Sequence, residues 1–235
     1  MQSLKKTFFT AVVFLGSFSC YFAQAEDSNP SCTLESRLQQ LITEQEETER
    51  LHRLFDLYWD WRIAENPEDA TFLGYAGKHD QWLDLSSAAI NRRQHFTHQL
   101  LNILSSISTT DLNQEDIVSY KILKSILEED LMESEFGNHY LLINQMHGIH
   151  LTIPLIIEIM PTKTVQDYEN ILARLSRLPI LLQQVIDLLE QGIAAGITPP
   201  RIAIRSVPQQ ILNQITENPL ESPLLRAFRQ IPSSI

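Results

Sequence analysis

The sequence has few of the residues on which several kinds of site depend. Only two of its 235 residues are cysteine and seven are glycine. Cys32 alone would remain after loss of the leader described below, so an internal disulfide is excluded and core packing must supply stability. The scattered glycines form no phosphate-cradling loop, and no serine stands in a G-x-S-x-G turn. Two common nucleotide-binding and nucleophile motifs are therefore absent from the sequence.

Basic residues are also scarce. The chain has 18 lysines and arginines against 29 acidic residues, a formal net charge of −11. Binding to nucleic acid requires clustered lysines and arginines that neutralise phosphates, so a nucleic-acid partner is disfavoured. The acidic balance favours solubility and carries no information about the fold.

The amino terminus has the pattern of an export signal. Lys5 and Lys6 precede a mostly apolar run, Thr7–Phe22, and Ala23 and Ala25 then give the small-x-small pattern that signal peptidase recognises. We predict cleavage after Ala25 and a periplasmic or secreted product with a formal charge of −13. The apolar run falls short of the roughly 20 residues that cross a bilayer, so no membrane span is expected after its removal.

Lipid attachment at Cys20 is the alternative fate of this leader. Lipoprotein processing usually requires a leucine three residues before the cysteine, and this chain has Ser17 there. Anchoring at Cys20 is therefore less favoured than cleavage.

Three regions follow from the composition of the chain. They are a signal peptide over 1–25, a polar and acidic lead with a helix over 26–52, and a helical region over 53–235. No alternating, strand-like pattern of useful length is present, whereas apolar residues recur at three- and four-residue spacing. The predicted fold class is all-α, a multi-helix antiparallel array with kinked long helices.

The first long helix is predicted from one apolar stripe. Its residues are Leu51, Leu54, Phe55, Tyr58, Trp59 and Ile63. Asn66-Pro67 ends this helix, since proline disfavours helical geometry in the residue before it. After a loop over 72–85, Ser86 or Ser87 is predicted to cap a second helix. Asn113, followed three residues later by Asp116, is predicted to cap a third.

The clearest helix is predicted to begin at Thr164, with Asp167 three residues later completing a capping arrangement. Pro179 should kink or split it, because proline lacks the amide hydrogen and clashes with the preceding turn. Beyond the proline the apolar stripe resumes at Leu182, Val185, Ile186, Leu189 and Ile193. Gly192 and Gly196 mark the end of the helix.

Two later segments complete the prediction. The apolar run Ile149–Met160, which contains Pro154, is interpreted as either a strand or a buried turn. A further helix is predicted over Gln209–Ile215, with weaker segments around 224–228.

Two histidine pairs have the spacing of metal ligands on a helix, His147 with His150 and His95 with His98. Zinc requires three or four ligands, and neither pair has a third ligand close in sequence. Ordinary surface or core histidines are favoured. The acidic residues around 128–135 are interpreted in the same way, as a solvated helix face. No catalytic, cofactor-binding or metal-binding residue is predicted.

One groove is considered on the first long helix. Asp60 and Glu65 flank the aromatic stripe, and Trp61 lies off it. These three residues are the candidates to line a groove or interface, although solvent-facing acids commonly border such a stripe.

A set of short motifs suggests a family. They are Asn66–Thr71 with Gly74, Arg92-Arg93, Asp116–Leu123, Ile143–Gln145 before Gly148 and Pro154, and Asp167–Leu175 leading to Pro179, Gly192, Gly196 and Pro199. In order and spacing the chain resembles the amino-terminal part of the bacterial DUF885 (domain of unknown function 885) family. The resemblance implies a helical, exported or membrane-tethered protein related to zinc metallopeptidases.

The resemblance also implies what this chain lacks. The family's zinc motif, a His-Glu-x-x-Pro-Gly-His helix, lies in its carboxy-terminal half, and this sequence contains no His-Glu dipeptide. The leading hypothesis is therefore an exported, truncated relative that holds no zinc and is inactive alone, with exposed apolar stripes on helices such as 164–193. The partner would be a peptide or the missing carboxy-terminal half. The alternatives are a stand-alone peptide- or protein-binding module and the non-catalytic subunit of a split peptidase.

Overall fold

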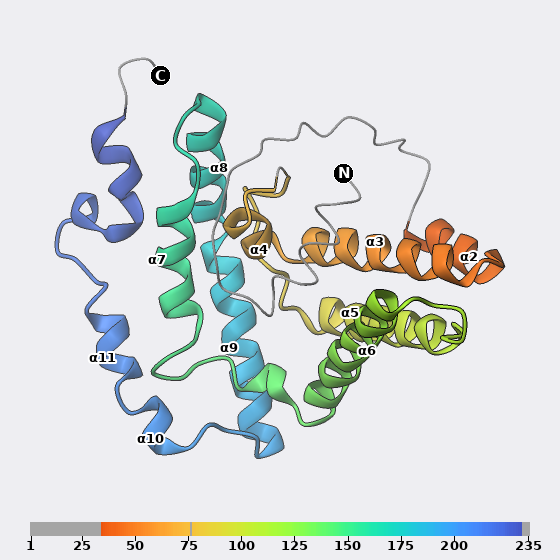
Figure 1. The fold of residues 1–235 in the computed structure, drawn as a ribbon. Helices are drawn as coiled ribbons and strands as arrows, with labels where there is room; N and C mark the ends of the chain where they lie inside the picture. Colours follow the sequence, from red (N-terminus) through yellow and green to blue (C-terminus); the bar gives the residue numbers. More distant parts are fainter. Residues whose placement is uncertain (1–33, 76, 232–235) are drawn as a thin grey trace. The chain divides into compact units, whose positions relative to one another are not determined.

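The computed structural model describes residues 34–75 and 77–231, and every regular element within these ranges is a helix (Figure 1). This confirms the all-α class. In chain order the helices are α2 (Leu34–Thr43), α3 (Glu47–Glu65), α4 (Pro67–Phe72), α5 (Ser87–Ser105), α6 (Gln114–Glu135), α7 (Ile149–Ile159), α8 (Val165–Ser176), α9 (Leu178–Ala195), α10 (Arg201–Ile204) and α11 (Val207–Leu212), with short 3-10 segments η1 (Asn138–Tyr140), η2 (Pro219–Glu221) and η3 (Pro223–Gln230). The predicted cleavage residues Ala23 and Ala25 and both cysteines lie outside the described residues.

The chain divides into two compact units. Among the described residues, unit 1 comprises Leu34–Trp61 together with Thr97–Glu128, and unit 2 comprises Arg62–Phe96 together with Glu129–Ile231. The division falls within α3, α5 and α6. The domain boundaries predicted at residues 25 and 52 stay predictions.

Unit 1 is built on leucines from four helices. Its buried residues include Leu38, Leu41, Leu51, Leu54, Leu57, Tyr58, Leu100, Leu104, Leu123 and Leu127. On α3 the sequence predicted the buried face slightly out of register, because Leu57 and Trp61 are buried whereas Phe55 and Trp59 are half-buried. An aromatic-rich helix has apolar residues around more than one face, so the pattern alone does not fix which of them point inward.

The predicted cap of α6 is confirmed. The Asn113 side-chain oxygen accepts a hydrogen bond from the backbone N–H of Asp116 at 2.9 Å, and the Asn113 amide donates to the Asp116 carboxylate at 2.7 Å. The buried Asp116 carboxylate also lies 2.7 Å from the His52 ring nitrogen Nε2. Asn113 and Asp116 thus cap the amino-terminal turn of α6, and Asp116 also links this turn to α3.

Unit 2 has its core around α7, which runs antiparallel to α8 and α9 (Figure 1). The core residues are Trp82, Ile153, Ile156, Ile157, Met160, Ile171 and Leu181. Phe228 of η3 packs on this core, with its ring edge-on to Tyr168 of α8 at a centroid distance of 5.5 Å. The predicted segment around 224–228 is therefore real, although it is a 3-10 helix.

The run Ile149–Met160 is neither the strand nor the turn that the sequence suggested. It forms α7 through Ile159, with Pro154 inside the helix. A proline in a helix removes the hydrogen bond to the carbonyl four residues earlier, here that of His150. The Gln214 side-chain amide donates to the His150 carbonyl oxygen at 2.6 Å. A residue remote in sequence therefore supplies the bond that Pro154 cannot make.

The predicted start of α8, the split beside Pro179 and the end of α9 at Gly196 are confirmed. Thr164 and Asp167 form a complete capping box at the start of α8. The helix divides at Arg177, and Pro179 lies in the first turn of α9. Gly196 ends α9 in the left-handed conformation at a φ of 73°, which glycine adopts without steric cost.

Gly192 does not end α9 but lies buried within it. A β-carbon built there would lie 2.8 Å from Tyr140 Cβ and 2.9 Å from the backbone oxygen of Ile197. The absence of a side chain at Gly192 lets η1 approach α9 closely.

The single apolar stripe predicted beyond Pro179 lies on more than one face of α9, and part of it is exposed, as the leading hypothesis expected. Leu182, Ile186 and Ile193 are exposed, whereas Val185 is buried. Helix α9 has two apolar columns side by side, and only one of them faces the core of unit 2. Apolar periodicity identifies both columns, but it does not choose between them.

Candidate functional site

The most polar buried cluster of unit 2 is centred on Arg174 in α8, whose side chain is fully buried. Its guanidinium donates from Nε to the backbone oxygen of Gln81 at 2.7 Å and from Nη1 to Thr71 Oγ1 at 3.0 Å. Nη2 donates to the backbone oxygen of Pro67 at 3.2 Å. All three acceptors are neutral oxygens, and together they tie α8 to α4 and to the loop that follows it.

Trp82 completes this arginine cluster from the loop side. Its ring lies under the Arg174 guanidinium at 4.9 Å from the ring centroid, a cation–π contact. The indole Nε1 in turn donates to the Arg174 backbone oxygen at 2.8 Å. The indole N–H of Trp82 and the guanidinium of Arg174 therefore both have hydrogen-bond partners inside the core.

Burial perturbs the charges of the cluster. It lowers the pKa of Arg174 to about 10, against the opposing attraction of Glu68 and Asp80. Burial likewise raises the pKa of Glu68, whose two carboxylate oxygens each accept from the backbone N–H of Leu83 at 3.1 Å. The arginine stays charged at neutral pH, because even the lowered pKa is well above 7.

His79 lies at the edge of the cluster. Its Nδ1 is 3.1 Å from Thr71 Oγ1, and the same hydroxyl lies 2.9 Å from the backbone oxygen of Pro67. Burial lowers the pKa of His79, and the positive charge of Arg174 lowers it further. The neutral imidazole is therefore the form that this environment favours.

The chemistry of the cluster is that of a structural joint. The guanidinium is wholly covered by protein and leaves no open face for a ligand. Sequence reasoning missed this cluster, although one signal was present: Arg174 follows Tyr168 and Ile171 at three-residue steps along the buried face of α8. An arginine on an apolar stripe is a reason to look for buried acceptors.

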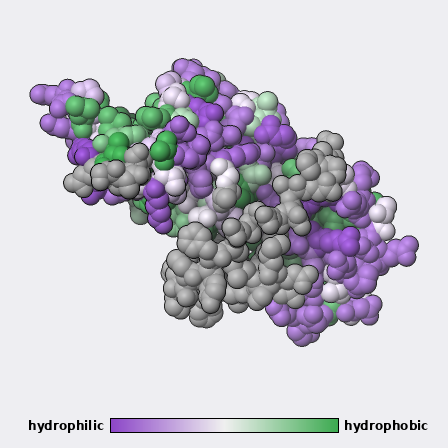
Figure 2. All heavy atoms as spheres, turned by 90° about the horizontal axis from the view of Figure 1, so that it is seen from above, coloured by the Kyte–Doolittle hydropathy of each residue, from purple (hydrophilic) through white to green (hydrophobic). Residues whose placement is uncertain are grey.

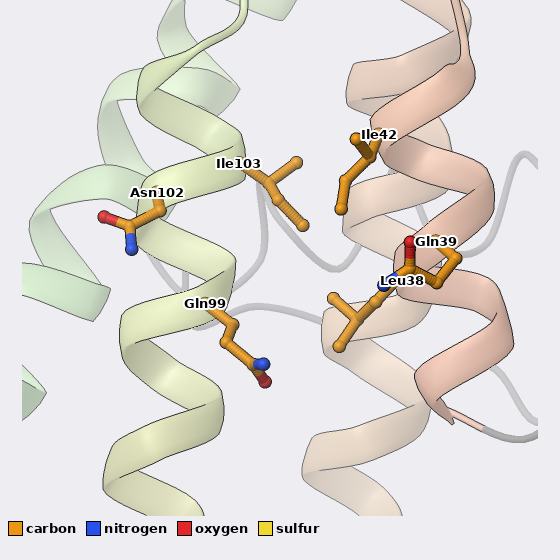
Figure 3. Close-up of a pocket in the computed structure, with 6 residues that line it drawn as sticks. All are labelled: Leu38, Gln39, Ile42, Gln99, Asn102 and Ile103. Atoms are coloured by element: carbon orange, nitrogen blue, oxygen red, sulfur yellow. The ribbon is translucent and has the colours of Figure 1, made fainter.

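Unit 1 contains a small hollow between α2 and α5, with a volume of about 240 Å³ (Figure 3). It is lined by Leu38, Gln39, Ile42, Gln99, Asn102 and Ile103. Ile42 and Ile103 point toward one another across it (Figure 3). The lining is uncharged, with amides beside aliphatic side chains, and suits a neutral, peptide-like group.

The structure gives the surroundings of Trp61, Asp60 and Glu65, the three residues predicted to line a groove. Trp61 is buried, with its ring centroid 6.1 Å from that of Tyr58. The Asp60 carboxylate accepts from Arg37 at 3.0 Å. Glu65 lies in unit 2 and accepts from Arg92 at 3.2 Å and Arg93 at 3.5 Å. None of the three lines the hollow, and their role in a groove stays a prediction.

The histidine pairs are also placed. His95 and His98 are both exposed on α5, and His147 is exposed in the segment before α7. His150 is buried, with Nε2 3.2 Å from the Gln210 side-chain oxygen and Nδ1 without a hydrogen-bond partner in the described structure. Over residues 34–75 and 77–231, no three His, Cys, Asp or Glu side chains come together as metal ligands.

None of the helices described in the structure combines the length and the apolar character needed to cross a bilayer. The described part of the chain is thus all-α, with a buried arginine cluster in unit 2 and a shallow hollow in unit 1. The family model described as "Bacterial protein of unknown function (DUF885)" matches residues 67–234, well over half of the chain. The protein belongs to the DUF885 family. No curated protein matches the sequence.

Proposed function

We propose that this protein is an exported helical portion of a DUF885 metallopeptidase-like protein, inactive by itself, whose uncovered apolar faces pack against a zinc-bearing segment. The observation that carries the proposal is the amount of apolar helix surface left uncovered in unit 2. On α7 the exposed apolar residues are Leu151, Leu155 and Ile159, and on α9 they are Leu182, Ile186 and Ile193.

Helix α7 supports the proposal most directly. Only His150, Thr152 and Glu158 among the eleven residues of α7 are polar. Apolar side chains of α7 itself therefore lie on every face of the helix. A helix that is apolar on all sides is ordinarily buried on all sides. Figure 2 shows apolar side chains at the surface, interspersed with polar ones. The apolar side chains that α7 leaves exposed favour a partner polypeptide that covers them.

Among the described residues, His147 and His150 do not supply the complete ligand set that a zinc site requires. His150 is the only histidine of the 147–150 pair that is buried, and its Nε2 is engaged by Gln210. His147 is exposed, and no third ligand lies with the pair in the described residues. We therefore assign no catalytic step to these two histidines.

Zinc binding and peptidase activity of the purified chain test the proposal. We expect well under one zinc ion per chain after dialysis against micromolar zinc, measured by atomic emission, and no cleavage of casein or of a mixed peptide library. Stoichiometric zinc together with cleavage that is lost in His147→Ala and His150→Ala would refute it. Amino-terminal sequencing of the exported product tests the leader, with Glu26 expected as the first residue.

A stand-alone peptide-binding module is the second candidate, and the hollow between α2 and α5 favours it. An uncharged lining of amides and aliphatic groups suits an extended peptide, whose backbone amides and apolar side chains it would complement. Its volume of about 240 Å³ is small for a drug-sized ligand and suits one large side chain. If this hollow is the peptide site, replacing Ile103 with Gln should abolish peptide binding. If the first proposal holds and the hollow has no such role, the replacement should change no peptide binding.

A further inference from the structure

Helix α9 carries two apolar columns, offset by one residue along its whole length. The inner column is Leu181, Val185, Leu188 and Gly192, all of which are buried. The outer column is Leu182, Ile186, Leu189 and Ile193. Leu182 is 43% exposed, Ile186 46% and Ile193 68%, with Leu189 half-buried. The outer column is therefore a continuous apolar face that the core of unit 2 leaves uncovered.

The spacing of the outer column selects the kind of partner. Its members are four, three and four residues apart, which is the a/d spacing of a heptad repeat. Two helices that meet along such a seam pack nearly parallel, at a crossing angle of about 20°. The column therefore fits a second helix lying lengthwise on α9.

The polar residues beside the outer column indicate the charge of that partner. On its solvent side lie Gln183, Asp187 and Glu190, all exposed. The Gln183 amide donates to Asp187 at 2.8 Å, and in the described structure no cation forms an ion pair with Asp187 or Glu190. The other side of the column is the buried inner column. A docked helix therefore meets acidic side chains along one edge only.

We propose that the outer face of α9 docks an amphipathic helix whose apolar seam is flanked by lysine or arginine. The chain as a whole has a net charge of −11, which favours a basic partner over a second copy of itself. This inference deepens the proposed function. It rests on that function in one respect, that the helix bound by α9 in nature belongs to the zinc-bearing segment. Binding to α9 can be measured without zinc and without peptidase activity.

Three synthetic 18-residue peptides are the probes. The first has leucine at the a and d positions and lysine at e and g. The second replaces each lysine with glutamate, and the third has the composition of the first in scrambled order. Binding to the full chain is measured by fluorescence anisotropy at low salt and at 0.5 M salt. We expect the lysine peptide to bind about tenfold more tightly than the glutamate peptide at low salt, since two exposed ion pairs contribute modestly.

Variants on two faces of α9 locate the binding. Ile186→Ser removes the centre of the outer column and should weaken the lysine peptide about tenfold, from the lost apolar burial. Ile193→Ser, at the most exposed position of the column, is the second test. Ile180→Ser is the matched control, because Ile180 is equally apolar and 63% exposed but lies on another face of the same helix. Glu190→Gln should reduce the preference for lysine and its dependence on salt.

Each outcome decides the proposal. Selective binding of the lysine peptide that is lost in Ile186→Ser and Ile193→Ser and kept in Ile180→Ser supports it. Equal binding of all three peptides, or binding insensitive to both column variants, overturns it. Sedimentation that shows a dimer dissociated by Ile193→Ser also overturns it, because the occupant is then a second copy. If the chain binds zinc and cleaves peptides, the proposed function is refuted, but the peptide-binding results on α9 do not change. The two proposals can therefore be refuted independently.

Discussion

Replacing Arg174 with methionine tests the central joint of unit 2. Methionine fills much of the space of the arginine side chain but donates no hydrogen bond. The backbone oxygen of Gln81 and Thr71 Oγ1, which accept from the guanidinium at 2.7 and 3.0 Å, would each lose that donor. The Pro67 oxygen keeps a contact with the Thr71 hydroxyl at 2.9 Å.

The expected loss follows from these contacts. Two buried acceptors deprived of a donor cost about 1–3 kcal/mol each. Removing a buried charge offsets part of this cost, because a desolvated guanidinium is itself unfavourable. We therefore expect Arg174→Met to lower the free energy of unfolding by about 2–4 kcal/mol.

Urea unfolding followed by far-ultraviolet circular dichroism measures this change, and hydrogen exchange over α4 and α8 locates it. Arg177→Met is the matched control on the same turn. Its partly exposed ion pair with Asp80, at 2.6 Å, is expected to contribute about 0–1 kcal/mol. A loss in Arg174→Met of less than about 0.5 kcal/mol, the range of ordinary surface substitutions, would refute the reasoning.

Three further predictions concern local features. Gly192→Ala should destabilise unit 2 by about 1–3 kcal/mol in urea unfolding, because the new β-carbon overlaps Tyr140; unchanged stability would contradict the close packing. His79 should make stability fall with acidification. Its pKa is lowered in the folded chain, so below its ordinary value of 6.5 the unfolded chain binds the proton more readily. Urea midpoints between pH 7.5 and 5.5 measure this fall, and His79→Gln should reduce it; an identical pH profile in that variant would exclude the histidine. Thr164→Ala should cost about 1 kcal/mol through loss of the cap, whereas Thr162→Ala should have little effect; equal thermal shifts in the two would contradict the assignment.

The sequence alone was enough for features that depend on neighbouring residues. The capping pairs Thr164 with Asp167 and Asn113 with Asp116 lie three residues apart, so their geometry is set within one helical turn. The break at Asn66-Pro67 and the split beside Pro179 follow from the missing amide hydrogen and fixed backbone angle of proline. The all-α class followed from the spacing of apolar residues.

Only the tertiary structure decided features whose partners are remote in the chain. Helix α7 tolerates Pro154 because Gln214, 64 residues from His150, donates to the carbonyl that the proline leaves unpaired. Arg174 is buried because its acceptors come from residues 93 to 107 positions away. The exposed column of α9 was indistinguishable from the buried one, because both have the same periodicity. Periodicity records which residues can share a face, but burial depends on what packs against that face in the folded chain.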